Sequence, residues 1–126
     1  MSVRATAFAA ACNAAGFKAE VMRDIRSAQW TKFVGLCTNA ALTSLMRLPA
    51  GHIYHRDDGV AMALRAFKEV EAVGRAEGME IPVDIADRAI KLHQSFPHSM
   101  YASMYHDVAR GRRLELESLS GLVVRL

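Results

Sequence analysis

A chain of 126 residues, of which 52% are hydrophobic and 23% charged, can bury a core without disulfides or a structural metal, and this composition excludes a disordered chain. Its net charge of +3 comes from scattered lysines and arginines, apart from the run RGRR at residues 110–113, which has no aromatic residues interleaved with it. We therefore expect a solvated surface there, with an anion-binding patch as the alternative, and no nucleic-acid partner.

The first predicted elements are a helix and a short extended stretch. Residues 3–15 are rich in alanine and predict an amphipathic helix that ends at Gly16. A targeting leader is the alternative for this segment, but its apolar part is short. Residues 17–22 (FKAEVM) alternate apolar and polar side chains, which is typical of extended backbone.

A long helix and an amphipathic helix are predicted next. Asp24 is a suitable N-cap for a helix over residues 25–47, because its carboxylate can accept from the free amides of the first turn. Proline and glycine then interrupt the pattern, so residues 50–59 are predicted as a loop. Residues 60–77 carry apolar side chains at helical spacing on one face.

Three further helical segments complete the predicted fold. One starts at Asp84 and runs to Pro97, one covers residues 98–111, and the last opens in residues 114–126. No longer strand pattern occurs than that of FKAEVM. The sequence predicts an all-α fold in which residues 1–126 form a single helical domain of about six helices.

The long helix raises a question about Lys32, because the fourteen residues that follow it, 33–46, carry no charge. Such a helix is typically central and covered by others, and a lysine on it either reaches solvent or points into a polar cleft. Asn39 lies seven positions on, within about 20° of the direction of Lys32, and Thr43 stays on nearly the same side. This polar stripe predicts the lining of a pocket for a small polar molecule.

A second group of candidate residues lies in SMYHDVARGRRLELESLSG, residues 103–121. Ser103 precedes the basic turn, and Glu115 and Glu117 follow it. Glutamates near arginines commonly form surface ion pairs, and Glu117 fits that interpretation. Glu115 is two residues away, on a different side of the helix, and could face a cleft instead.

These motifs, in this order, resemble the C-terminal domain of ketopantoate reductase (2-dehydropantoate 2-reductase). The resemblance rests on WTKF in an apolar helix, followed about 70 residues later by SMYHDVARGRRLELESLSG, and it extends from AAGFKAEVMRDI to VVRL. It implies the all-helical domain that this family shares with 6-phosphogluconate dehydrogenase-like proteins. It also implies an oxidoreductase that uses NADPH to reduce a 2-keto acid, in pantothenate biosynthesis if the substrate is ketopantoate.

By the same resemblance, Lys32 is the catalytic lysine, Glu115 the active-site glutamate and Ser103 the serine that binds the substrate carboxylate. An ammonium group stabilises the charge that develops on a carbonyl oxygen and can deliver a proton to it. Asn39 and Thr43 are the further substrate-binding candidates. Better-known members of the family carry asparagines where this chain has Leu36 and Ala40, so the pocket takes either ketopantoate or a more apolar keto acid.

The sequence contains no G-x-G-x-x-G motif and no βαβ pattern. The family binds NADPH on a separate N-terminal domain, so no cofactor is expected to bind this chain alone, and the chain alone is expected to be inactive. The expected partners are a small 2-keto acid, a dinucleotide-binding domain in cis or in trans, and a second copy in a homodimer. The alternative is a non-catalytic helical dimerisation module derived from the same fold.

Metal, membrane and disulfide sites are not expected. His52 and His55 form an H-x-x-H pair without a third ligand nearby, and Cys12 and Cys37 lack ligand-type spacing. No run reaches the roughly 20 apolar residues that span a bilayer. We therefore expect a cytoplasmic protein with two reduced thiols.

Overall fold

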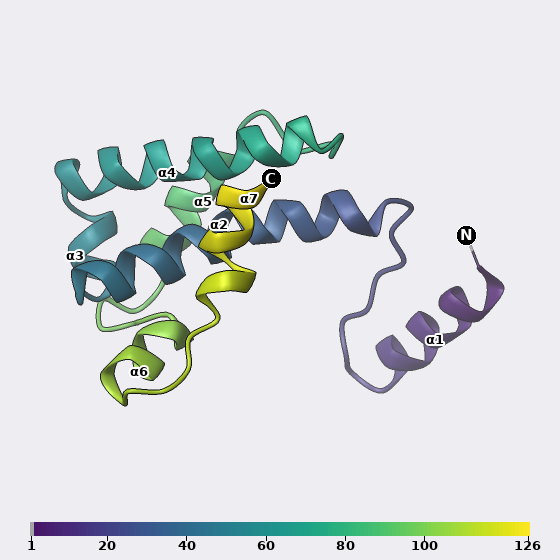
Figure 1. Cartoon of the computed structure of the whole chain (residues 1–126). Coiled ribbons are helices and arrows are strands. Elements are labelled where there is room, and N and C mark those ends of the chain that lie inside the picture. The colour runs from purple at the N-terminus through teal and green to yellow at the C-terminus, as the bar shows by residue number, and fades with distance from the viewer. Residues whose placement is uncertain (1) are drawn as a thin grey trace.

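The computed structural model describes residues 2–126, and every regular element in this part of the chain is a helix (Figure 1). This result confirms the all-α prediction, and no described helix is long and apolar enough to cross a membrane. The elements in chain order are α1 (Val3–Ala14), α2 (Ile25–Met46), α3 (Ala50–Tyr54), α4 (Asp57–Ala76), α5 (Ile85–Gln94), α6 (Ser103–Ala109), the 3-10 helix η1 (Leu116–Ser118) and α7 (Ser120–Arg125).

Helix α2 is the central element, as its apolar sequence predicts. It packs against α3, α4, α5, α6 and α7, and Figure 1 shows it running through the helical body. The predicted cap is present: Asp24 Oδ1 accepts hydrogen bonds from the backbone amides of Arg26, at 3.0 Å, and Ser27, at 3.1 Å. The Ser27 hydroxyl also accepts from the amide of Glu80, at 2.8 Å, which ties the start of α2 to the segment before α5.

The main core lies between α2, α3, α4 and α5. Its largest fully buried side chains come from three of these helices: Val34, Ile53, Tyr54 and Phe67. Helices α2 and α4 approach each other closely at Gly74, where an added Cβ would lie 2.7 Å from an indole carbon of Trp30. The absence of a side chain at this glycine therefore makes room for the tryptophan.

Helix α1 lies apart from this body and is joined to it by an extended segment (Figure 1). The helix ends as predicted, with Gly16 at a φ of +85°, a conformation that glycine adopts readily. Asn13 then closes the turn, because its side chain donates to the carbonyl of Ala19 and accepts from the amide of the same residue. None of the residues of α1 is buried, and the apolar side chains of Val3 and Phe8 are exposed.

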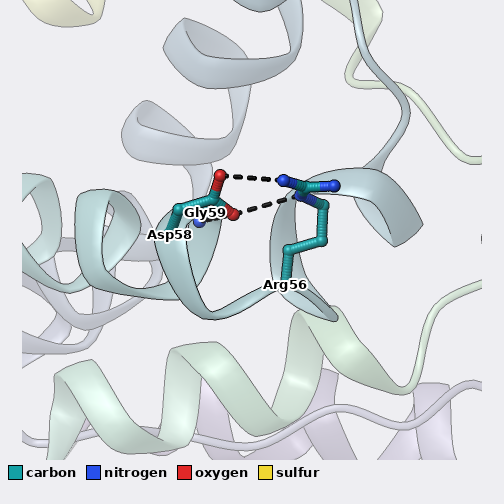
Figure 2. Close-up of polar contacts among 3 residues, drawn as sticks. All are labelled: Arg56, Asp58 and Gly59. Atoms are coloured by element: carbon teal, nitrogen blue, oxygen red, sulfur yellow. Dashed lines mark hydrogen bonds and ion pairs between the residues drawn. The ribbon is translucent and has the colours of Figure 1, made fainter.

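The prediction of a loop over residues 50–59 was wrong, because this segment contains α3 and the start of α4. Pro49 caps α3 instead of breaking the chain, since the fixed φ of proline suits a helix start. At the start of α4, Asp58 accepts from the amide of Gly59, at 2.9 Å, and from two nitrogens of Arg56, at 3.1 and 3.0 Å (Figure 2). Two aspartates in the first turn of α4 suit the positive end of its dipole.

The C-terminal part of the chain is less helical than predicted. Within residues 98–111 only α6 is helical, because the backbone before it is used in tertiary hydrogen bonds. The carbonyl of Met100 accepts from the amide of Ala50, at 2.8 Å, and that of His98 from the amide of Gly51, at 3.1 Å. The last predicted helix is divided into η1 and α7 at Leu119, which has non-helical backbone angles.

Candidate functional site

A cavity of about 510 Å³ lies between α2 and α5, and we call it the α2–α5 cavity. A larger hollow, of about 620 Å³, lies between α1 and residues 21–23, but the lysine and asparagine predicted for the site are not among its lining residues. The α2–α5 cavity is lined from α2 by Thr31, Lys32, Gly35, Leu36 and Asn39, and from α5 and the segment after it by Arg88, Leu92, His93, Phe96 and Met100.

Two cationic side chains border the α2–α5 cavity. Lys32 is exposed, and within residues 2–126 it forms no ion pair. Arg88, on α5, is paired with Asp84 at 2.8 Å. Lys32 therefore reaches solvent, which is the first alternative raised by the sequence. It also borders a cavity, but the walls of this cavity are largely apolar, unlike the polar cleft of the second alternative.

The predicted polar stripe on α2 divides between the cavity and the core. Asn39 lines the cavity but is only 6% exposed, and its amide oxygen Oδ1 has no hydrogen-bond partner. Thr43 is fully buried instead; its hydroxyl donates to the carbonyl of Asn39, at 2.7 Å, and accepts from the amide of Ala102, at 3.4 Å. The structure thus brings Lys32 and Asn39 to one cavity and leaves Thr43 behind it.

Ser103 and Glu115 lie outside the lining of this cavity. Both are exposed, Ser103 as the first residue of α6 and Glu115 directly before η1. The residues beside them hold the segment onto α2: Ala102, Met104 and Leu114 pack in one cluster with Ala40. Ala40 is two helical turns beyond Lys32, so these two candidates are attached to the same helix as the lysine.

His93 is a cavity residue to which the sequence assigned no role. It is 4% exposed, its Nδ1 lies 2.6 Å from the carbonyl oxygen of Ala89, and its ring stacks on that of Tyr54 at 4.6 Å. Burial lowers the pKa of His93 below its ordinary value of 6.5, although the hydrogen bond to Ala89 opposes this shift. The sequence feature that could have pointed to His93 is its position on the apolar face of the helix predicted from Asp84 to Pro97, a face that also carries Ile85.

The buried imidazole predicts a pH dependence of folding. We expect stability to fall as the pH drops through 6.5 towards the lowered pKa of the folded state, because the unfolded chain binds a proton at His93 that the folded chain resists. Replacing His93 by phenylalanine should flatten this slope below about pH 6.5, as measured by thermal unfolding. The exposed His106, replaced in the same way, should leave the slope intact, and equal slopes in both variants would contradict the assignment.

The histidine pair of the H-x-x-H motif lies away from the α2–α5 cavity. His52 is on α3 and His55 directly follows that helix, where its ring packs against that of His98 with centroids 4.2 Å apart. Residues 2–126 contain no group of three or more histidine, cysteine, aspartate or glutamate side chains that could hold a metal ion.

Residues 24–126 match the family model described as ketopantoate reductase PanE/ApbA C terminal. This chain belongs to the ketopantoate reductase family. The match starts at Asp24, the cap of α2, and includes the whole helical body together with Lys32, Asn39, Ser103 and Glu115. The family expected from the motifs is thereby confirmed.

The named relatives in the ketopantoate reductase family are longer than this chain. A 2-dehydropantoate 2-reductase of Caulobacter vibrioides is 34% identical over 120 residues, which make up 94% of this chain and 40% of that protein. A 2-dehydropantoate 2-reductase of Mycobacterium tuberculosis is 35% identical over 120 residues, or 94% of this chain and 39% of that protein. The chain therefore spans about 40% of the length of these relatives.

Solved ketopantoate reductases share the fold. The PanE/ApbA family ketopantoate reductase from Ralstonia eutropha JMP134 superposes with a TM-score of 0.86 at 32% identity, covering 98% of this chain and 41% of the other. A dimeric ketopantoate reductase from Staphylococcus aureus, at 22% identity, superposes with a TM-score of 0.87 over 99% of this chain and 43% of the other. The helical body described here is thus the C-terminal domain fold of ketopantoate reductases.

Proposed function

We propose that this chain is the substrate-side domain of a ketopantoate-reductase-like oxidoreductase, which reduces a 2-keto acid to a 2-hydroxy acid. The observation that carries the proposal is an unpaired lysine at the edge of a cavity whose lining contains no carboxylate: Lys32 borders the α2–α5 cavity together with Asn39. If ketopantoate is the substrate, the reaction belongs to pantothenate biosynthesis.

In this proposal Lys32 is the group that meets the reacting oxygen. Reduction of a ketone puts negative charge on the carbonyl oxygen, and an ammonium group stabilises that charge and can supply the proton. The amide nitrogen of Asn39 is suited to donate to an oxygen of the substrate, because the amide oxygen is shut off from solvent. The family resemblance gives Glu115 the role of positioning the lysine or a substrate hydroxyl, and Ser103 that of binding the substrate carboxylate, although neither residue lines the α2–α5 cavity. Thr43 would support Asn39 from behind.

The described residues do not fit NADPH by themselves. A dinucleotide site of the usual kind needs a parallel sheet and a glycine-rich turn, and residues 2–126 contain neither a strand nor such a turn. The hydride would come from NADPH held by a separate dinucleotide-binding domain, in cis or in trans. In this proposal, residues 1–126 supply one helical domain, and the exposed apolar side chains of α1 favour a covering partner, either that domain or a second copy.

A fusion protein tests this function. The chain would replace the matching C-terminal region of the Caulobacter vibrioides relative, behind the N-terminal region of that protein. We expect the fusion to oxidise NADPH in the presence of a 2-keto acid, whereas the chain alone does not. A folded fusion that binds NADPH but reduces neither ketopantoate nor a branched-chain keto acid would overturn the proposal. That result, together with a dimer of the chain in solution, would favour the alternative of a non-catalytic dimerisation module.

A further inference from the structure

We infer that His93 determines which 2-keto acids the α2–α5 cavity prefers, because its ring nitrogen Nε2 accepts a hydrogen bond from a hydroxyl group of the substrate. This inference rests on the proposed function and adds a specificity-determining residue to it. It starts from the position of the imidazole, which reaches from α5 to α2. An added Cβ at Gly35 would lie 3.3 Å from Cε1 of His93, so the absence of a side chain at this glycine lets the ring lie against α2.

Gly35 lies between the two α2 side chains that the proposed function uses. Residues three and four apart on a helix are neighbours, with about 5–6 Å between their Cβ atoms. Lys32 comes three positions before Gly35 and Asn39 four positions after it, and all three line the cavity. The ring of His93 therefore meets α2 between the ammonium group and the amide.

The hydrogen bond to Ala89 decides which nitrogen of His93 carries the proton. A carbonyl oxygen can only accept, so Nδ1, which lies 2.6 Å from that of Ala89, is the donor. Burial lowers the pKa of His93, which keeps the ring neutral, and the second nitrogen of a neutral ring is an acceptor. Nε2 forms no hydrogen bond with any of residues 2–126, and it is bonded to Cε1, the ring atom that lies against α2.

Aromatic neighbours hold this acceptor in place beside a donor. Tyr54 stacks on the ring of His93 at 4.6 Å, and Phe96 meets it edge-on at 5.4 Å. On α2, the amide oxygen of Asn39 is enclosed by protein, which leaves its amide nitrogen to donate to a ligand. A hydroxyl group both donates and accepts, so it can bond Nε2 and the amide of Asn39 together, while the keto group of the same substrate lies towards Lys32.

Two other side chains are candidates for the same hydroxyl group. The Thr31 hydroxyl donates to the carbonyl of Ser27, at 2.9 Å, and can still accept, but Thr31 is only half-buried, so water competes for it. Glu115 does not line the cavity, which leaves it the other role that the resemblance gives it, the positioning of the lysine. His93 is 4% exposed, so its acceptor is the one for which water competes least.

Calorimetric titration of the chain with two acids tests the role of His93 without a cofactor. The acids are ketopantoate and trimethylpyruvate, which is ketopantoate without its hydroxyl group. We expect ketopantoate to bind about tenfold more tightly, because a buried acceptor left unpaired is unfavourable. His93→Asn keeps an amide nitrogen near the position of Nδ1 and has no atom at that of Nε2, so it should abolish this preference. His93→Gln puts an amide group near Nε2 and should retain most of it.

Two controls separate this role from a structural one. Trimethylpyruvate should bind equally well to the chain and to both His93 variants, which shows that the cavity is intact, and Thr31→Val should leave the preference unchanged. Without any substitution, the nitrogen-15 resonance of His93 Nε2 should shift when ketopantoate is added but not when trimethylpyruvate is added.

Equal affinities of the two acids, binding of neither, or an unmoved Nε2 resonance would overturn the inference. A preference that survives in His93→Asn but is lost in Thr31→Val would assign the hydroxyl group to Thr31 instead. The fusion assay distinguishes these results from failure of the proposed function. A fusion that reduces both acids with equal kcat/KM preserves that function and refutes only the role of His93, whereas a fusion that reduces neither refutes the function itself.

Discussion

Replacing Lys32 by methionine in the fusion protein is expected to lower kcat for keto-acid reduction by about a hundredfold or more. The physical reason is the loss of the ammonium group that stabilises charge on the carbonyl oxygen, and loss of one such donor commonly has an effect of this size. Methionine keeps an unbranched apolar stem of similar length, and Lys32 is exposed, so folding should be preserved. Steady-state rates of NADPH oxidation, with circular dichroism to verify folding, give the measurement.

Arg88 provides the control for Lys32, because it is the other cation on the α2–α5 cavity. Its guanidinium is already paired with Asp84, so Arg88→Met should change kcat by less than about tenfold. If the two variants lost activity equally, the effect would come from the charge of the cavity as a whole. If Lys32→Met kept full kcat, the lysine would not be the catalytic group.

Replacing Gly59 by alanine is expected to destabilise the fold by about 3 kcal/mol, as backbone overpacking does. An added Cβ would lie 2.1 Å from the carbonyl oxygen of Ile53 and 2.9 Å from its carbonyl carbon. Both are backbone atoms, so they cannot swing aside as a side chain could. The start of α4, with the Arg56–Asp58 pair of Figure 2, would have to move away from α3. Urea unfolding at equilibrium measures the change.

The variant Gly16→Ala is the control, because it separates the steric clash at Gly59 from the conformational cost of replacing a glycine. Its φ is +85°, and an added Cβ would find nothing within 4 Å. Gly16→Ala should therefore cost only about 1 kcal/mol, the penalty of the left-handed backbone. Equal losses of stability in the two variants would mean that α3 and α4 can separate freely at Gly59.

The sequence predicted best those features that depend on neighbouring residues. Asp24 caps α2, and Gly16 ends α1, because both effects act within one helical turn. The prediction failed at α3, where the first backbone amides of the helix donate hydrogen bonds to the carbonyls of His98 and Met100. No local pattern around residue 50 carries information about those acceptors.

The same distinction applies to the candidate site. Helical geometry correctly put Lys32 and Asn39 on one side of α2, where both line the cavity. It put Thr43 on that side too, but Ala102 covers Thr43, and the covering residue comes from another segment. His93 was not assigned to the site because the opposite wall depends on which helix packs against α2, and that information is long-range.

The hydrogen bonds at the start of α3 also determine when this helix can fold during synthesis. The amides of Ala50 and Gly51 donate to the carbonyls of Met100 and His98, which come 50 and 47 positions later in the chain. While the polypeptide leaves the ribosome, these amides stay hydrated until the segment at Met100 has emerged. That segment also carries Met100 to the α2–α5 cavity, so the wall of this cavity is completed only after residue 100 has been synthesised.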